Sequence, residues 1–163
     1  KIIHPTCIRG NYSEIQALLH NCGTVTGVDA AEDALAEAEE TDLPELMKQY
    51  AKENQMILVA SGETDLITDG SCVYRCHNGS PMMARITGSG CMSTVMLGAF
   101  LSAENSVESA VACCAFTGIA GELAAKEMTA QKRGTMTFRN WFIDAVSLLT
   151  PEQLEHGTDW GWF

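Results

Sequence analysis

The sequence predicts an α/β fold in which a mainly parallel central sheet is flanked by helices. Residues 56–60 (MILVA) form a continuous apolar run that ends in Ser61-Gly62, which is typical of a strand buried on both faces of a parallel sheet. Amphipathic helical patterns precede this run, and long apolar helical patterns follow residue 91. With 163 residues, of which 46% are hydrophobic, the chain has the size and the apolar content of one domain with its own core.

The first predicted elements are a strand and a helix. Residues 1–11 (KIIHPTCIRGN) begin as an apolar stretch that indicates a strand, and Arg9-Gly10-Asn11 indicates the end of that strand followed by a turn. Apolar residues then recur at helical spacing over residues 12–21. Cys22-Gly23 ends this pattern as a helix C-cap would.

The next segment predicts a longer helix before the buried strand. Residues 24–30 have the composition of a loop. Residues 30–54 are rich in Ala and Glu and carry leucines on one side, which predicts an amphipathic helix. Pro44 is expected to interrupt it and to lie in the first turn of a second segment.

Short strands are expected after the buried one. Residues 66–67, 72–76 and 82–86 are apolar stretches separated by the turn dipeptides Asp69-Gly70 and Asn78-Gly79. They predict antiparallel hairpins.

Helices are expected for most of the remaining chain. Residues 92–103 and 107–130 are apolar nearly all round, which indicates helices buried against a sheet or against each other. Gly118 and Gly121 are spaced for a close contact on the second of these helices. Residues 137–149 predict a last amphipathic helix, which Pro151 is expected to stop.

The net charge and the cysteines indicate which binding partners and which cellular compartment to expect. Ten Lys and Arg against 21 Asp and Glu give a formal charge of −11, and Lys132-Arg133 is the only adjacent basic pair, so nucleic acid is not an expected partner. Apolar runs are broken before the roughly 18–20 residues of a membrane span, and no signal peptide is recognisable, so no membrane partner is expected. The seven cysteines lie mostly in apolar stretches, which favours free thiols in a reducing cytoplasm. Cys72, Cys76 and His77 allow a zinc site, but packed thiols are the favoured interpretation because a second ligand pair is missing.

Polar motifs follow the predicted strands or open the predicted helices. These are Arg9-Gly10-Asn11, the pair Asn11 and Glu14, Ser61-Gly62-Glu63, and residues 87–91 (TGSGC). Ligands of open α/β sheets bind beyond the carboxyl ends of the strands. The motifs are therefore expected to share one rim, where a nucleotide would lie.

The glycine-rich stretch before residue 92 offers a site for an anion. Gly88, Ser89 and Gly90 at the start of a helix would let backbone N–H groups approach a phosphoryl group. Cys91 would lie near the positive end of the helix dipole, where a thiol is a candidate general base or nucleophile. The pattern alone slightly favours a packed or incidental thiol over a catalytic one.

The residues after the first strand allow two interpretations of similar weight. Asn11 and Glu14 are three residues apart, so at a helix start they can jointly hold hydrated magnesium near phosphates. They can equally form an N-cap with a carboxylate near the helix dipole. Arg9 can bind a phosphate in a bidentate manner or pair with a surface carboxylate.

Taken together, the ordered motifs resemble the hydroxyethylthiazole kinase family of the thiamine pathway. The resemblance covers almost the whole chain and rests on three matches to the family pattern: RGNxxE at residues 9–14, the ExD segment at residues 61–65, and TGxGC at residues 87–91. It implies a ribokinase-like fold and ATP-dependent phosphorylation of 4-methyl-5-(2-hydroxyethyl)thiazole.

The resemblance also implies a role for each matched residue. Gly88, Ser89 and Gly90 would form the anion hole for the transferring phosphoryl group, and Cys91 would stand beside the substrate hydroxyl, where most relatives of the fold place an aspartate. Arg9 and Ser61 would contact ATP. Asn11 and Glu14 would organise Mg²⁺.

The chain departs from the family pattern in two residues and in length. Ser61 stands where threonine is common, and Ser89 where alanine is frequent. Family members are longer, so residues 1–163 are expected to be the C-terminal portion of a single kinase domain that lacks its N-terminal part. Family members form trimers, which implies a homo-oligomer. A ribokinase-like kinase of another alcohol, such as a hydroxymethylpyrimidine or a sugar, and a non-catalytic nucleotide-binding fragment are the alternatives.

Overall fold

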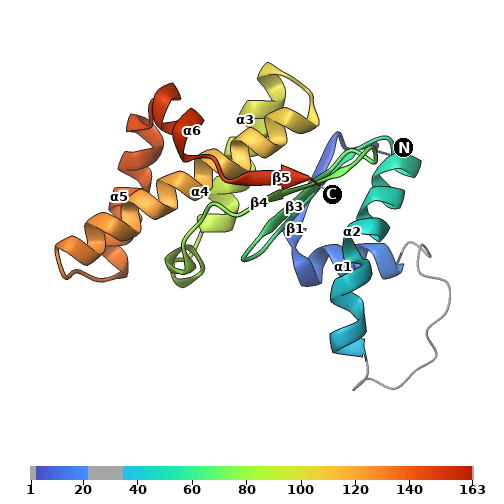
Figure 1. Cartoon of the computed structure of the whole chain (residues 1–163), viewed down its shortest axis with the longest axis horizontal. Helices are drawn as coiled ribbons and strands as arrows, with labels where there is room; N and C mark the ends of the chain where they lie inside the picture. Colours follow the sequence, from blue (N-terminus) through green and yellow to red (C-terminus); the bar gives the residue numbers. More distant parts are fainter. Residues whose placement is uncertain (1–2, 22–34, 163) are drawn as a thin grey trace. The chain divides into compact units, whose positions relative to one another are not determined.

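The computed structural model describes residues 3–21 and 35–162, in two compact units (Figure 1). Unit 1 comprises Lys1–Arg75 with Trp162–Phe163, and unit 2 comprises Cys76–Gly161. The strands follow the order β1-β2-β3-β4-β5 in a mixed sheet. Helices accompany the sheet in sequence, so the predicted α/β class is confirmed.

Unit 1 is built on a parallel strand pair followed by a hairpin. Strand β1 (Cys7–Asn11) leads into helix α1 (Tyr12–Asn21), and helix α2 (Leu35–Asn54) leads into strand β2 (Ile57–Ser61). β1 and β2 pair in parallel, with Cys7 opposite Ile57 and Asn11 opposite Ser61. β3 (Asp65–Thr68) then pairs with β2 in the antiparallel direction. The first four residues of β2 are buried, as the apolar run predicts.

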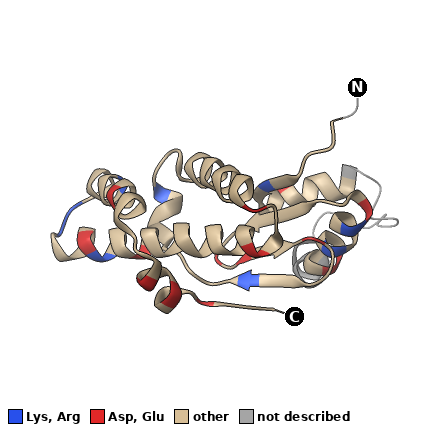
Figure 2. Ribbon diagram, turned by 90° about the horizontal axis from the view of Figure 1, so that it is seen from above, with Lys and Arg blue, Asp and Glu red and all other residues tan. Residues whose placement is uncertain are grey.

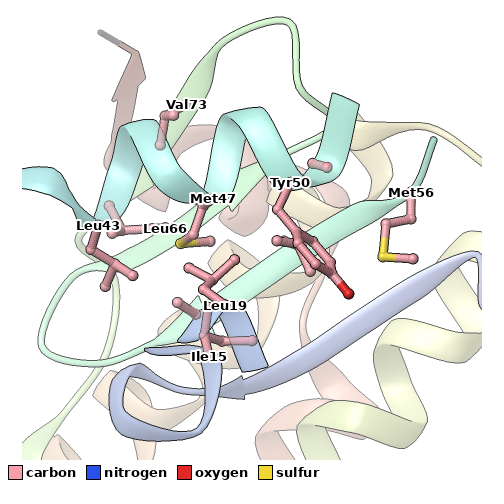
Figure 3. Packing of buried hydrophobic residues seen from close by; sticks show 11 residues of the cluster. Ile15, Leu19, Leu43, Met47, Tyr50, Met56, Leu66 and Val73 are labelled. Atoms are coloured by element: carbon pink, nitrogen blue, oxygen red, sulfur yellow. The ribbon is translucent and has the colours of Figure 1, made fainter. Parts of the chain in front are cut away.

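The core of unit 1 lies between its two helices and the sheet. In Figure 3, Leu43 and Met47 of α2 point toward Ile15 and Leu19 of α1. All four side chains are no more than 1% exposed. Burying a side chain of this size contributes about 1.5–3 kcal/mol, so this contact rather than local helix propensity holds α1 and α2 in place.

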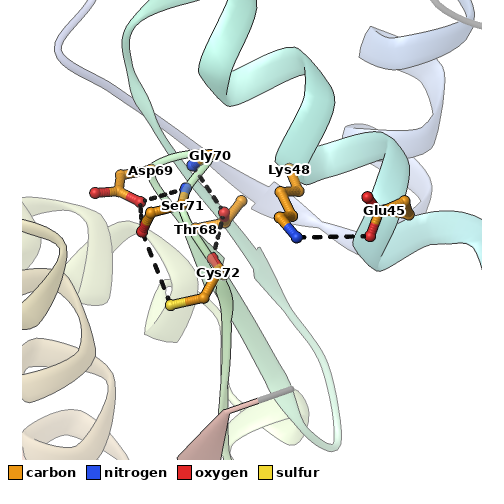
Figure 4. A network of polar contacts seen from close by, with 7 residues as sticks. All are labelled: Glu45, Lys48, Thr68, Asp69, Gly70, Ser71 and Cys72. Carbon is orange, nitrogen blue, oxygen red and sulfur yellow. Dashed lines mark hydrogen bonds and ion pairs between the residues drawn. The ribbon is translucent and has the colours of Figure 1, made fainter.

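A polar turn joins β3 to strand β4 (Val73–Cys76) (Figure 4). The fully buried Thr68 hydroxyl donates to the Cys72 carbonyl at 2.6 Å and accepts from the Gly70 N–H at 2.9 Å. Gly70 has φ +94°, and a Cβ there would lie 2.5 Å from the Lys52 backbone nitrogen. The Asp69-Gly70 dipeptide is therefore a turn, as predicted, that also needs glycine for close approach to α2.

Unit 2 is mainly helical. It contains the short 3₁₀ helix η1 (Pro81–Arg85), α3 (Ser89–Ala103), α4 (Val107–Ala130), α5 (Thr135–Leu148) and α6 (Pro151–Gly157), followed by β5 (Trp160–Trp162), whose last residue is assigned to unit 1. α4 and α5 share a core in which Phe138 and Phe142 are fully buried and stacked, with ring centroids 6.3 Å apart. The predicted segments 92–103 and 107–130 are both helical, as expected.

Helix α4 is buried along most of its length. Among the helices of residues 3–21 and 35–162, α4 is the one that is long and apolar enough to cross a membrane, judged by length and composition alone. Of the apolar window that meets this test, 67% is buried inside the structure. The core helix of a globular unit has the same properties. Gly118 and Gly121 make the close contacts that their spacing predicts, since a Cβ at either would lie 2.5 Å from a neighbouring residue.

The charged residues of the described segments are distributed over many elements (Figure 2). Apart from the pair Lys132-Arg133, the basic residues lie singly along the chain. Lys48 and Glu45, at 4.0 Å, form an i,i+3 pair on the surface of α2. Exposed pairs of this kind contribute little to stability.

Two predictions for unit 1 are wrong. Arg9, Gly10 and Asn11 form the end of a strand, as predicted, but no turn follows them, because α1 begins directly at Tyr12. Pro44 lies inside α2 rather than starting a second segment. The buried Leu43 and Met47 on either side fix this helix to the core, which offsets the hydrogen bond that proline removes. The predicted C-cap at Cys22-Gly23 and the loop at 24–30 lie outside the described residues.

Two predictions for unit 2 are also wrong. Residues 82–86 are not a strand, because Ser80 accepts from the Met82 N–H and Pro81 opens η1. Pro151 ends no helix but begins α6, and residues 137–149 are not the last helix. Thr150 and Gln153 form a capping box there, with bonds of 2.9 and 3.3 Å.

Candidate functional site

The carboxyl ends of the two parallel strands meet at one edge of unit 1. Asn11 ends β1, Ser61 ends β2, and the two residues pair in register. The Ser61 hydroxyl donates to the Gly10 carbonyl at 3.2 Å. The structure therefore brings the RGN and SGE motifs together at the edge where ligands of α/β sheets bind.

Asn11 and Glu14 form a reciprocal cap on α1. The Asn11 side-chain oxygen accepts from the Glu14 N–H at 2.9 Å, and Glu14 Oε2 accepts from the Asn11 N–H at 2.8 Å. This is a capping box with Asn11 as the N-cap. Gly10 makes room for it, since a Cβ at that position would lie 3.0 Å from both Cβ and Oε2 of Glu14. The N-cap interpretation is thus confirmed, and both side chains are exposed at the strand edge.

Arg9 is half-buried on β1 and lies two residues from Cys7, on the same face of the strand. Burial raises the pKa of the Cys7 thiol to about 11, and the positive charge of Arg9 acts in the opposite direction. Burial thus favours the protonated form of the Cys7 thiol. Arg9 places a fixed positive charge on β1 within two residues of the strand end.

Two side chains fix the loop after β2, and one of them, Tyr12, was not singled out in the sequence analysis. The Tyr12 hydroxyl donates to the Thr64 carbonyl at 2.5 Å, and a Cβ at Gly62 would lie 3.0 Å from the Tyr12 ring. Asp65 accepts from the Gly62 N–H at 3.0 Å. The i,i+3 spacing of Gly62 and Asp65 is a local signal for this turn. The Tyr12 contact spans 52 positions of the chain and leaves no local signal.

The glycine-rich stretch opens helix α3 in unit 2. Gly88 is the N-cap with φ 93° and ψ −1°, in the left-handed region that favours glycine. The Met92 N–H donates to the Gly88 carbonyl at 2.9 Å, so the regular helix begins there. The first turn of an α-helix has backbone N–H groups that can bind an anion. The anion hole expected at Gly88, Ser89 and Gly90 stays a prediction.

The side chains of this turn have different surroundings. The Ser89 hydroxyl donates to the Met83 carbonyl at 2.8 Å, so it ties the turn to η1. Cys91 is exposed, whereas Cys76, Cys113 and Cys114 are buried and Cys7 and Cys72 are half-buried. Among the cysteines that the structure describes, Cys91 is thus the one whose thiol is most open to a substrate.

The predicted site residues therefore fall into two groups. Arg9, Asn11, Glu14 and Ser61 lie on β1, on β2 and at the start of α1 in unit 1, and residues 88–91 lie in unit 2. The single rim expected for both groups stays a prediction. Over residues 3–21 and 35–162, no three His, Cys, Asp or Glu side chains gather as a metal site. A metal at Asn11 and Glu14 would thus take most of its ligands from water and phosphates, as magnesium commonly does.

Several known proteins that are similar to this chain are described as hydroxyethylthiazole kinases. A model described as the hydroxyethylthiazole kinase family matches residues 1–152. Hydroxyethylthiazole kinase 1 of Methanosphaera stadtmanae is 40% identical over 152 residues, covering 89% of this chain and 53% of the relative. Hydroxyethylthiazole kinase of Cereibacter sphaeroides is 39% identical over 155 residues, covering 95% and 55%.

A solved structure shows the same fold. The hydroxyethylthiazole kinase protein of Pyrococcus horikoshii superimposes with a TM-score of 0.77 at 24% identity, covering 96% of this chain and 54% of that one. The chain spans about half the length of the curated relatives that it matches.

Proposed function

The chain belongs to the hydroxyethylthiazole kinase family, and from this premise we propose that it is the C-terminal portion of a kinase domain that phosphorylates 4-methyl-5-(2-hydroxyethyl)thiazole. The primary alcohol oxygen of the thiazole forms a bond to the γ-phosphorus of ATP. The bond from that phosphorus to the β,γ-bridging oxygen breaks, ADP leaves, and the alcohol proton passes to a base. The product is the phosphate monoester of the thiazole alcohol.

The observation that carries this proposal is the turn at the start of α3. Gly88 is the N-cap of α3 and has the left-handed conformation that glycine adopts readily, with φ 93°. Phosphoryl transfer is catalysed mainly by positioning and by donors aimed at the developing negative charge. Gly88, Ser89 and Gly90 supply such donors from the backbone, without a positively charged side chain.

Cys91 is the candidate catalytic residue because its exposed thiol stands in the first turn of α3. It would orient the alcohol or accept its proton. If the thiol is the base, Cys91→Ala lowers kcat, whereas Cys91→Asp keeps or raises it, since a carboxylate can take the same proton. Steady-state turnover of the three proteins measures this. Equal rates for wild type and Cys91→Ala would contradict the assignment.

Magnesium and ATP would be held by the residues at the strand edge of unit 1. Glu14 Oε2 is engaged by the capping box, but Oε1 has no hydrogen bond within the described residues. This oxygen fits a hydrated magnesium ion, which on binding neutralises charge on the phosphates. Arg9 would bind a phosphate oxygen, and Ser61 would contact the nucleotide at the end of β2.

The substitution Glu14→Gln distinguishes the role of Glu14 in the helix cap from its role in binding the metal. Glutamine at this position keeps the reciprocal cap on α1, because its carbonyl oxygen accepts from the Asn11 N–H. It removes the negative charge, so the Mg²⁺ concentration for half-maximal rate should rise by about tenfold. Titration of the rate with Mg²⁺ at saturating ATP tests this, with Glu45→Gln on the surface of α2 as the matched control. An unchanged Mg²⁺ requirement in Glu14→Gln would remove Glu14 from the metal site.

The proposed enzyme would act in the cytoplasm and as a homo-oligomer, a trimer by resemblance to its family. The cysteines of unit 2 support a reducing compartment, because Cys76, Cys113 and Cys114 are buried as thiols. Light scattering coupled to size-exclusion chromatography measures the oligomer directly. A monomer at micromolar concentration would contradict the trimer.

The experiment that tests the function is an ADP-release assay with competing alcohols. ADP release is expected to start when the thiazole alcohol is added. Its rate should stay the same when a hydroxymethylpyrimidine or a sugar is also present. Faster release with either competitor would favour the other small-alcohol kinases. ATP binding without alcohol-dependent ADP release would favour the non-catalytic nucleotide-binding fragment.

A further inference from the structure

The segment between β4 and η1 is held in unit 2 by the side chain of Asn78. This side chain is 8% exposed. Its amide nitrogen donates to Glu122 Oε1 at 3.1 Å and to the Gly157 carbonyl at 2.8 Å. Its oxygen accepts from the Asp159 N–H at 2.7 Å. The Asn78 amide thus joins the end of β4 to α4 and to the segment before β5.

Glu122 of α4 binds the same segment twice. Its Oε1 atom accepts from the Asn78 side chain and, at 2.8 Å, from the Gly79 N–H. Hydrogen bonds to a carboxylate are roughly twice as strong as neutral ones. Glu122 is exposed on α4. Its two hydrogen bonds distinguish it from Glu108 and Glu127 of the same helix, for which no such side-chain bond is found among the described residues.

Two glycines of α4 allow this helix to pack closely against the same segment. A Cβ at Gly118 would lie 2.5 Å from backbone atoms of Asn78, and one at Gly121 would lie 2.5 Å from the Met83 sulfur. The spacing of the two glycines therefore matches two points of one segment, at residue 78 and at residue 83. Between these points Ser80 caps η1, and the Met83 N–H donates to the Ser80 carbonyl at 2.9 Å.

Met83 connects η1 to the glycine-rich turn at residues 88–90. Its carbonyl accepts from the Ser89 hydroxyl at 2.8 Å. The Ser89 hydroxyl also lies 3.5 Å from the Ile86 carbonyl, and the Ile86 N–H lies 3.5 Å from the Met83 carbonyl. A continuous series of contacts within unit 2 thus runs from Glu122 through η1 to the residue that follows Gly88.

We propose that Glu122 is a positioning residue for the anion-binding turn at residues 88–90, acting through Gly79, η1 and the Ser89 hydroxyl. The inference rests on the proposed function for its catalytic consequence. Glu122 itself touches no reacting atom. Its carboxylate fixes where η1 lies, and η1 fixes the direction of the N–H groups at the start of α3. Small misplacements of such donors reduce the rate of the chemical step with little effect on ground-state binding.

The test compares Glu122→Ala with Glu122→Gln, because glutamine retains an acceptor oxygen for Gly79. Glu127→Ala is the matched control on the same helix, since no hydrogen bond of its side chain is found among the described residues. Glu122→Ala should lower kcat about tenfold with the KM for ATP unchanged, and Glu122→Gln should recover most of the rate. Hydrogen–deuterium exchange of residues 79–91 is the second readout and needs no activity. Exchange there should rise in Glu122→Ala and stay at the wild-type rate in the other two variants.

The outcomes separate this inference from the proposed function. If the wild type does not phosphorylate the thiazole alcohol, the proposed function fails, and the exchange pattern alone decides the role of Glu122. Unchanged exchange of residues 79–91 in Glu122→Ala overturns the inference. Faster exchange throughout unit 2 overturns it too, because Glu122 would then support the unit generally. Equal defects in Glu122→Ala and Glu122→Gln also contradict it.

Discussion

Replacing Gly88 by alanine tests whether the turn before α3 depends on its left-handed backbone. At φ 93° an L-residue is strained, whereas a Cβ there would meet no atom within 4 Å. The cost therefore comes from the backbone alone, and placing an alanine in this region costs about 1–2 kcal/mol. Gly98 lies in the interior of the same helix and also has open space around its Cβ. Alanine there should stabilise by about 0.5–1 kcal/mol, because helical glycine is unfavourable.

The pair of variants thus gives an internal comparison on one helix. Gly88→Ala and Gly98→Ala should differ by about 2 kcal/mol in the free energy of unfolding, with opposite signs relative to wild type. Urea unfolding followed by circular dichroism measures both. Gly88→Ala should also lose phosphorylation activity, while Gly98→Ala keeps it. Equal stability of the two variants would refute the assignment of strain to Gly88.

Two further predictions concern unit 1. Tyr12→Phe removes the hydroxyl that donates to the Thr64 carbonyl but leaves the ring against Gly62, so the free energy of unfolding should fall by about 1 kcal/mol in urea titrations; an unchanged midpoint would show that this bond does not hold the loop. The pKa of Cys7 is raised from 9.0 to about 11 by burial, so the folded chain keeps its proton where the unfolded chain loses it. Stability should therefore fall as pH rises from about 9 to 11, and Cys7→Ala should lack this component; parallel pH profiles for the two proteins would contradict it.

Patterns of local origin could be predicted from the sequence. The apolar run before Ser61 is the buried parallel strand, and the helical spacing over residues 12–21 gives α1 with the bounds that the structure shows. The capping box of Asn11 and Glu14 was one of two open interpretations, because a cap and a metal site use the same spacing. These features depend on neighbouring residues, which a single sequence contains in full.

Features that depend on distant contacts could not be predicted in the same way. Helix α2 continues past Pro44 because buried residues on either side hold the helix to the core of unit 1. Gly118 and Gly121 indicated a close contact, but not that their partners are Asn78 and Met83. Tyr12 reaches a loop 52 positions away, and Glu122 reaches one 43 positions away. Each of these contacts is set by tertiary packing, which leaves no periodic or local signal.

Under the proposed function, the site of this chain transfers a phosphoryl group from ATP to the thiazole alcohol. Phosphorus NMR of ATP, Mg²⁺ and 4-methyl-5-(2-hydroxyethyl)thiazole with the protein tests it most directly. We expect a phosphate monoester resonance that grows as the γ-phosphate resonance of ATP declines, and that needs both the alcohol and Gly88. Loss of the γ-phosphate to inorganic phosphate alone, or an unchanged ATP spectrum, would contradict it.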